Sequence, residues 1–154
     1  MRCRIRVPPP ARASAMIARK RPMRRRSARS GPTKRRDELV TRIMLAQEGD
    51  RCVGPATRGF TGDCGRQPVY TSHIYPKGPH PAMRHVVLNV CPLCYYHHMK
   101  WWHLHPIAAH EWATQRLGAG RMARLRLMSL TLNHVDKKAE EIMLRQEAKR
   151  LGVL

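Results

Sequence analysis

Apolar residues recur at a regular spacing only beyond residue 36 of this chain. From Asp37 to Gly49 they recur every three to four residues, which predicts an amphipathic helix with Asp37 as its N-cap. The expected buried positions of this helix are Leu39, Val40, Ile43 and Met44. Residues 1–36 show no such period and are rich in Arg, Pro and Ser, so we expect them to form a disordered arm.

Two short runs in the middle of the chain predict strands. Residues 69–74 are β-branched and aromatic, and residues 86–88 form a second apolar run after a loop rich in Gly and Pro. Pro92 suits the first turn of a helix, which would carry residues 94–102. The expected order here is strand, loop, strand, helix.

Helices are also predicted for the remainder of the chain. Residues 106–118 form one helix between Pro106 and Gly118, and residues 121–128 form a short basic one. The expected core contacts of the first are Ile107, Trp112 and Leu117. Asn133, followed three residues later by Asp136, approximates a capping box for the last helix. Its expected buried face is Val135, Ala139, Ile142, Met143 and Leu151, and we expect it to pack on the domain rather than on a partner chain.

Together these elements predict an α+β fold, a mainly helical small domain at residues 37–118 with a C-terminal helical extension at residues 119–154. A chain of 154 residues has room for one modest domain and its tails. No apolar run approaches the length of about 18 residues that a transmembrane helix needs, so we expect no membrane association.

The charge of the chain is concentrated at one end. Residues 1–36 carry 14 of the 30 Lys and Arg and no Asp or Glu, within a net charge of +20. Such a basic arm predicts attraction to a polyanion, most simply nucleic acid, because neutralised phosphates release their counterions. A solvated tail is an alternative, and an organellar transit peptide is a less favoured one because of the Pro8–Pro10 run.

Cysteine and histidine gather between residues 64 and 106, which hold three of the five Cys and seven of the nine His. Because most of the cysteines lie near histidines in the sequence, we expect metal ligation in a reducing compartment rather than a disulfide framework. From spacing alone, Cys91 and Cys94 form a short pair that Cys52 and Cys64 could complete as a tetrahedral zinc site. The other interpretation is that these thiols are small buried apolar groups.

The segments Ser72-His73-Ile74, Asn89, Cys94-Tyr95-Tyr96-His97-His98 and Trp102–Pro106 resemble the HNH endonuclease family, in particular its small phage and prophage members. The resemblance covers about residues 37–118 and implies a ββα-metal core, a hairpin followed by a helix, beside a structural zinc site. In the register it implies, Cys94 and His97 form the second zinc pair with Cys52 and Cys64. Cys91 in place of His97 is the alternative.

The resemblance also implies roles for the residues of a catalytic site. His73 would be the general base and His98 a ligand of a catalytic Mg²⁺, Mn²⁺ or Zn²⁺, while Asn89 would either bind that metal or hold the hairpin. His103 could add a ligand. Lys77 and Arg84 lie in the loop between the strands, where cations can bind the scissile phosphate.

Two features depart from the family pattern. Cys52 and Cys64 are separated by eleven residues where the family commonly has two, which requires a longer loop. Ser72 precedes His73 where many relatives have Asp or His, and a hydroxyl is a poor ligand for a divalent cation.

Two functions follow from this resemblance. The first is a metal-dependent DNA endonuclease, a phage-encoded hydrolase of phosphodiester bonds that acts on double-stranded DNA in the host bacterial cytoplasm. The alternative is a weakly active or inactive zinc-stabilised DNA-binding accessory factor that works with phage terminase or packaging proteins. A basic RNA-associated protein is a third, less favoured class.

Overall fold

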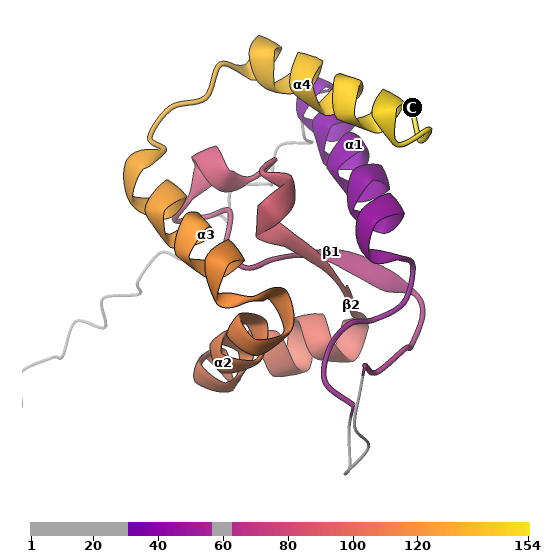
Figure 1. Cartoon of the computed structure of the whole chain (residues 1–154), viewed down its shortest axis with the longest axis vertical. Coiled ribbons are helices and arrows are strands. Elements are labelled where there is room, and N and C mark those ends of the chain that lie inside the picture. The colour runs from indigo at the N-terminus through magenta and orange to yellow at the C-terminus, as the bar shows by residue number, and fades with distance from the viewer. Residues whose placement is uncertain (1–30, 57–62) are drawn as a thin grey trace, which may run out of the picture.

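The computed structural model describes residues 31–56 and 63–154, and Figure 1 shows the arrangement of their helices and strands. They form a small α+β domain in which helices surround a two-stranded sheet, so the predicted fold class is confirmed at this level. Most of the predicted disordered arm, residues 1–30, lies outside the described residues. No helix within the described ranges is long and apolar enough to cross a bilayer.

The first helix, α1, spans Gly31–Glu48 and therefore begins six residues before the predicted start at Asp37. The helix extends this far because its early turns are held by tertiary contacts. Arg36 is buried, and its Nη1 donates to the carbonyl of Lys137, 101 residues further along the chain. Asp37 is consequently an interior helical residue whose carboxylate is available for contacts with other segments.

The sheet consists of β1 (Val69–His73) and β2 (Val90–Cys94), which pair antiparallel with His73 opposite Val90 and Ser72 opposite Cys91. The first strand was predicted correctly. The second was placed at residues 86–88, but Val87–Asn89 forms a 3-10 turn and the strand begins just after it. Pro92 therefore lies in a strand and not at a helix start, which a two-stranded sheet tolerates because each strand has an unpaired edge.

Four helical segments follow the sheet. They are the π-helix η3 (Tyr96–Trp102), α2 (Pro106–Leu117), α3 (Ala119–Thr131) and α4 (Lys137–Arg150). Gly118 adopts a φ of 89° between α2 and α3, as expected of a glycine at a helix end. The last helix is capped by Asp136, whose carboxylate accepts from the backbone N–H groups of Lys138 and Ala139, so the predicted cap at Asn133 is wrong.

Two apolar clusters hold the domain together. The larger joins β2, α2 and α3 and includes Trp102 and Leu125, with Trp112 and Leu117 packed against it as predicted. Ile107 was expected there but is 77% exposed. The smaller cluster joins α1 to α4, which cross each other in Figure 1.

The C-terminal helix packs on the domain, as predicted, but through a different face. Leu144 and Ala148 are its buried residues, with Leu151 packed beside them. Ile142 and Met143, which were expected in this face, are 56% and 68% exposed. Residues 119–154 therefore pack against the rest of the described domain.

Candidate metal centre and histidine pocket

Four side chains that the sequence paired for zinc lie together in the structure. One ligand atom from each of Cys52, Cys64, Cys94 and His97 falls within 4.8 Å of all the others. His97 Nδ1 lies 3.3 Å from Cys52 Sγ and 3.5 Å from Cys94 Sγ. Zn–S and Zn–N bonds of about 2.3 and 2.05 Å at a tetrahedral angle place S and N about 3.6 Å apart. The cluster therefore has the dimensions and the donor set of a site for a metal ion such as zinc.

Backbone pairing brings the first two cysteines together despite their long separation. Cys52 donates its N–H to the carbonyl of Arg66 at 3.1 Å, and its own carbonyl accepts from Gly65 at 2.9 Å. Cys64 donates to the carbonyl of Gly54 at 2.8 Å. These bonds join the two ends of the loop, so the thiols meet without requiring a short sequence spacing. The same segment is attached to β2, because Val53 donates to the carbonyl of Pro92.

The fourth side chain of the cluster, His97, packs tightly against its neighbours. Its ring is buried and meets Trp101 edge to face, with ring centroids 5.5 Å apart. Gly54 lies against the other side, where an added Cβ would be 2.6 Å from Cγ of the ring. A backbone hydrogen bond at Pro55 opposes the lowering of the His97 pKa that burial causes. A metal-binding imidazole commonly donates its second ring nitrogen to a carbonyl in this way.

The alternative ligand Cys91 is not part of the cluster. It is fully buried in β2, opposite Ser72, and burial raises its pKa to about 12. Burial also raises the pKa of Cys52 to about 12. Buried thiols in this condition are protonated unless a cation displaces the proton. Cys52 has three potential co-ligands for such a cation nearby, whereas Cys91 lies outside their group.

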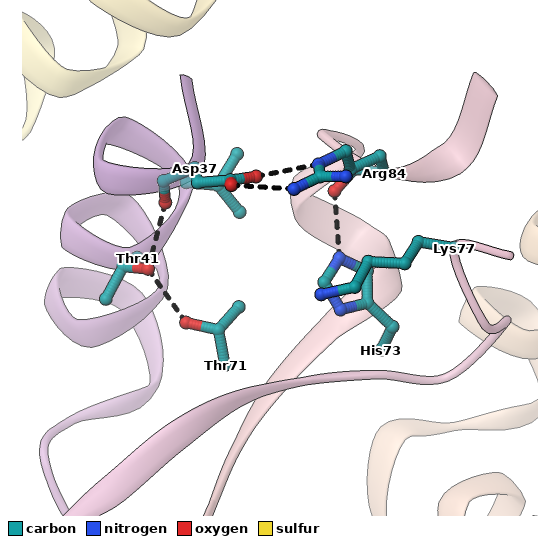
Figure 2. Close-up of a pocket in the computed structure, with 7 residues that line it drawn as sticks. Asp37, Thr41, Thr71, His73, Lys77 and Arg84 are labelled. Atoms are coloured by element: carbon teal, nitrogen blue, oxygen red, sulfur yellow. Dashed lines mark hydrogen bonds and ion pairs between the residues drawn. The ribbon is translucent and has the colours of Figure 1, made fainter. Parts of the chain in front are cut away.

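The other predicted site centres on His73, at the end of β1. Its Nε2 donates to the carbonyl of Arg84 at 2.9 Å, and burial lowers its pKa from the ordinary value. The ring borders a cavity of about 140 Å³ between α1, β1 and the loop after β1. Figure 2 shows this cavity with Thr41, Thr71 and Lys77 around it. The carbonyl contact fixes the proton of a neutral ring on Nε2, which leaves Nδ1 as the basic atom.

The Asn89 side chain is hydrogen-bonded within the loop between the strands and does not line the cavity. Its side chain is fully buried, its Oδ1 accepts from the Tyr75 N–H, and its Nδ2 donates to the carbonyls of Tyr75 and Met83. Both N–H groups of the amide are therefore used within the protein. Of the two roles predicted for Asn89, these contacts correspond to holding the hairpin.

Arg84 is less available than the sequence suggested. Its Nε and Nη2 bind the two carboxylate oxygens of Asp37 at 2.9 and 2.8 Å, a two-bond pair that Figure 2 shows directly. The partner Asp37 was missed as a site residue because its helical position suggested only a cap. No local sequence signal links Asp37 to a residue 47 positions away.

His98 follows His97 of the Cys52 cluster and lies in the neighbourhood of the His73 pocket. Burial lowers its pKa, and positive charge on His103, Lys77 and His73 lowers it further. The rings of His98 and His103 have centroids 5.4 Å apart. His98 therefore lies close enough to His103, Lys77 and His73 for their charge to lower its pKa.

The ligand supply around His98 is limited. Ser72 is fully buried, with its Oγ donating to the carbonyl of Tyr70, so burial keeps its oxygen away from a cation bound at the surface. Across residues 31–56 and 63–154, the only group of three or more potential metal-binding side chains is the Cys52 cluster. His98 and His103 could thus supply two imidazoles, and the rest of a coordination shell would have to come from water or substrate.

Comparison with models of protein families, with curated proteins and with solved structures finds no match for this chain.

Proposed function

We propose that this chain is a metal-dependent DNA endonuclease of the HNH type, in which His73 is the general base. The observation that carries the proposal is the His73 pocket. A half-buried imidazole whose pKa is lowered, with its Nε2 proton held by a carbonyl, borders a cavity that is also lined by Lys77 and by the Arg84–Asp37 pair. This is the arrangement expected of a neutral base beside a site for an anion.

In the proposed reaction, Nδ1 of His73 accepts a proton from the attacking water. The carbonyl of Arg84 remains bound to Nε2 and stabilises the imidazolium that forms. Lys77 faces the phosphate and offsets charge as it builds on the phosphoryl oxygens. A divalent cation held through His98 and His103 would stabilise the departing 3′-oxygen.

The zinc cluster has a structural part in this proposal. It connects the loop at residues 52–64 to the end of β2 and to η3, and its ligand His97 directly precedes His98. Fixing His97 therefore fixes the start of the helix that presents His98. A zinc ion would stabilise the position of the second histidine without taking part in the chemistry.

The test is a plasmid assay with the purified, zinc-loaded protein. Supercoiled plasmid should be nicked or linearised in Mg²⁺, Mn²⁺ or Zn²⁺, and His73→Ala should lower the rate by roughly 100- to 10,000-fold, the usual contribution of a general base. His110→Ala is the matched control, because His110 is an exposed residue of α2 and does not line the pocket. Equal rates for His73→Ala and His110→Ala would exclude His73 as the base.

A second candidate function is a zinc-stabilised DNA-binding factor that does not cleave. The observation that favours it is the short ligand supply near His98, where Ser72 faces a backbone carbonyl. Under this alternative the protein binds duplex DNA tightly and retains one zinc, but leaves plasmid intact in every divalent metal. An accessory role beside packaging proteins belongs to this alternative.

A further inference from the structure

The Cys52 cluster brings three thiols together, and these thiols differ in their exposure to solvent. The Sγ atoms of Cys52, Cys64 and Cys94 lie within 4.8 Å of one another. Cys52 and Cys94 are buried, whereas Cys64 is partly exposed. A reagent dissolved in water therefore reaches the cluster at Cys64.

The spacing of the sulfur atoms suits a second chemistry besides metal binding. A disulfide joins two sulfur atoms at about 2.05 Å, so two thiols of the cluster need to approach by less than about 3 Å. Rotation of a cysteine side chain from one staggered position to another moves Sγ by about that distance.

The backbone keeps the first two thiols together without help from a cation. Gly65 donates its N–H to the carbonyl of Cys52 at 2.9 Å, and Cys64 donates to the carbonyl of Gly54 at 2.8 Å. The segments that carry Cys52 and Cys64 are therefore hydrogen-bonded side by side. A bond between these two sulfur atoms requires no rearrangement of the chain around them.

Cys91 provides a comparison within the same protein. It is also a free thiol, but it is fully buried in β2 opposite Ser72 and does not belong to the cluster. It lacks both features that distinguish Cys64, which are exposure and a place among the clustered thiols. The two residues should consequently differ in their reaction with an oxidant.

We propose that Cys64 is an oxidation site, at which hydrogen peroxide or another hydroperoxide converts the Cys52 cluster from a metal-binding form to a disulfide form. The Cys64 thiolate attacks one peroxide oxygen, the O–O bond breaks, and Cys64 becomes a sulfenic acid as hydroxide leaves. The Cys52 thiolate then attacks the Cys64 sulfur, the S–O bond breaks, and a second hydroxide leaves. Two thiolates lose two electrons to the peroxide, and two protons from solvent convert the hydroxides to water.

The two forms of the cluster exclude each other, because the sulfur atoms of a disulfide are no longer thiolates that bind a metal ion. Oxidation therefore releases a bound ion such as zinc. It also removes the metal link between His97, near the start of η3, and the loop at residues 52–64. The inference concerns these thiols alone and does not rest on the proposed nuclease function.

The test follows metal and thiols rather than DNA cleavage. Full-length, zinc-loaded protein carrying Cys3→Ser, which leaves only the four thiols of the described residues, is titrated with hydrogen peroxide. Released zinc is measured with a colorimetric chelator, and free thiols are counted after denaturation. One zinc should be released for every two thiols lost, and peptide mapping without reductant should find a disulfide that contains Cys64. Cys91→Ala is the matched control and should release zinc at the same rate, because Cys91 lies outside the cluster.

A second measurement identifies the first thiol to react without replacing any residue of the cluster. Dimedone, which traps sulfenic acids, is added together with the peroxide and should label Cys64 in preference to Cys52 and Cys94. Zinc and thiols that persist in excess peroxide would overturn the inference, as would a disulfide without Cys64 or a dimedone label on another cysteine instead. Plasmid nicking is a separate result, since protein that never cleaves DNA can still support the oxidation site and protein that cleaves DNA can still refute it.

Discussion

Gly54→Ala should remove zinc from the Cys52 cluster although it replaces none of the four proposed ligands. The added methyl would lie 2.6 Å from His97 Cγ and 2.8 Å from its Nδ1. Carbon atoms pack at about 3.5 Å or more, so the ring must move by about 0.9 Å. Zinc sites tolerate only about 0.2 Å in their bond lengths. The backbone at Gly54 suits alanine, so the effect arises from the contact with His97 and not from local strain.

The expected loss of zinc affinity follows from the loss of the bond between His97 and the metal. Disturbing residues that merely orient zinc ligands weakens metal binding by about 10- to 100-fold, and displacing a ligand should reach at least the upper value. A 100-fold weaker affinity removes about 2.7 kcal/mol of zinc-linked stability. For a chain of this size, that corresponds to a fall in Tm of about 5–10 °C in excess zinc.

The assay combines zinc content, the thiolate-to-metal absorption of the Co²⁺-substituted protein, and thermal unfolding with and without zinc. Gly78→Ala is the matched control, because a Cβ there meets nothing within 4 Å. Gly54→Ala protein that keeps full zinc content, an unchanged Co²⁺ spectrum and the same zinc-dependent gain in Tm would refute the assignment of His97 as a ligand.

Three further changes test the remaining parts of the site. Asn89→Ala should destabilise the fold by about 2–4 kcal/mol, since it strands the backbone groups of Tyr75 and Met83, and urea unfolding that shows a loss below about 1 kcal/mol would contradict this. Cys91→Ala should retain full zinc content on elemental analysis, whereas loss of the metal would restore Cys91 as a ligand. The rise of the nicking rate with pH should have its midpoint below 6.5, because burial lowers the pKa of His73 from that ordinary value and the basic form persists to lower pH; a midpoint above 6.5 would contradict this.

The candidate metal cluster could be predicted from the sequence because its pattern is partly local. Cys94 and His97 are three residues apart, and the register implied by the resemblance favoured His97 over Cys91, which the structure leaves outside the cluster. The pairing of Cys52 with Cys64 had no local signal of its own. It depends on backbone bonds between residues 52–54 and 64–66, which spacing does not reveal.

Elements whose burial depends on distant partners were predicted less well. In α4, the stripes of Ile142 with Met143 and of Leu144 with Ala148 have similar apolar character, and only contact with α1 selects the second. The run of residues 86–94 contains apolar residues throughout, so its periodicity does not show where the 3-10 turn ends and β2 begins. In both cases tertiary packing decides between local alternatives of similar merit.

The contacts around His85 argue that α4 belongs to the same functional unit as the His73 pocket. His85 Nδ1 lies 2.9 Å from Glu140 on α4, and its Nε2 lies 3.2 Å from Asp37 on α1. Asp37 also holds the side chain of Arg84, and the Arg84 carbonyl holds His73. Displacing α4 would therefore release Glu140 from His85. His85 would then hold Asp37 less firmly, and Asp37 would hold Arg84 less firmly. Because the Arg84 carbonyl binds His73, the proposed base would lose part of its support.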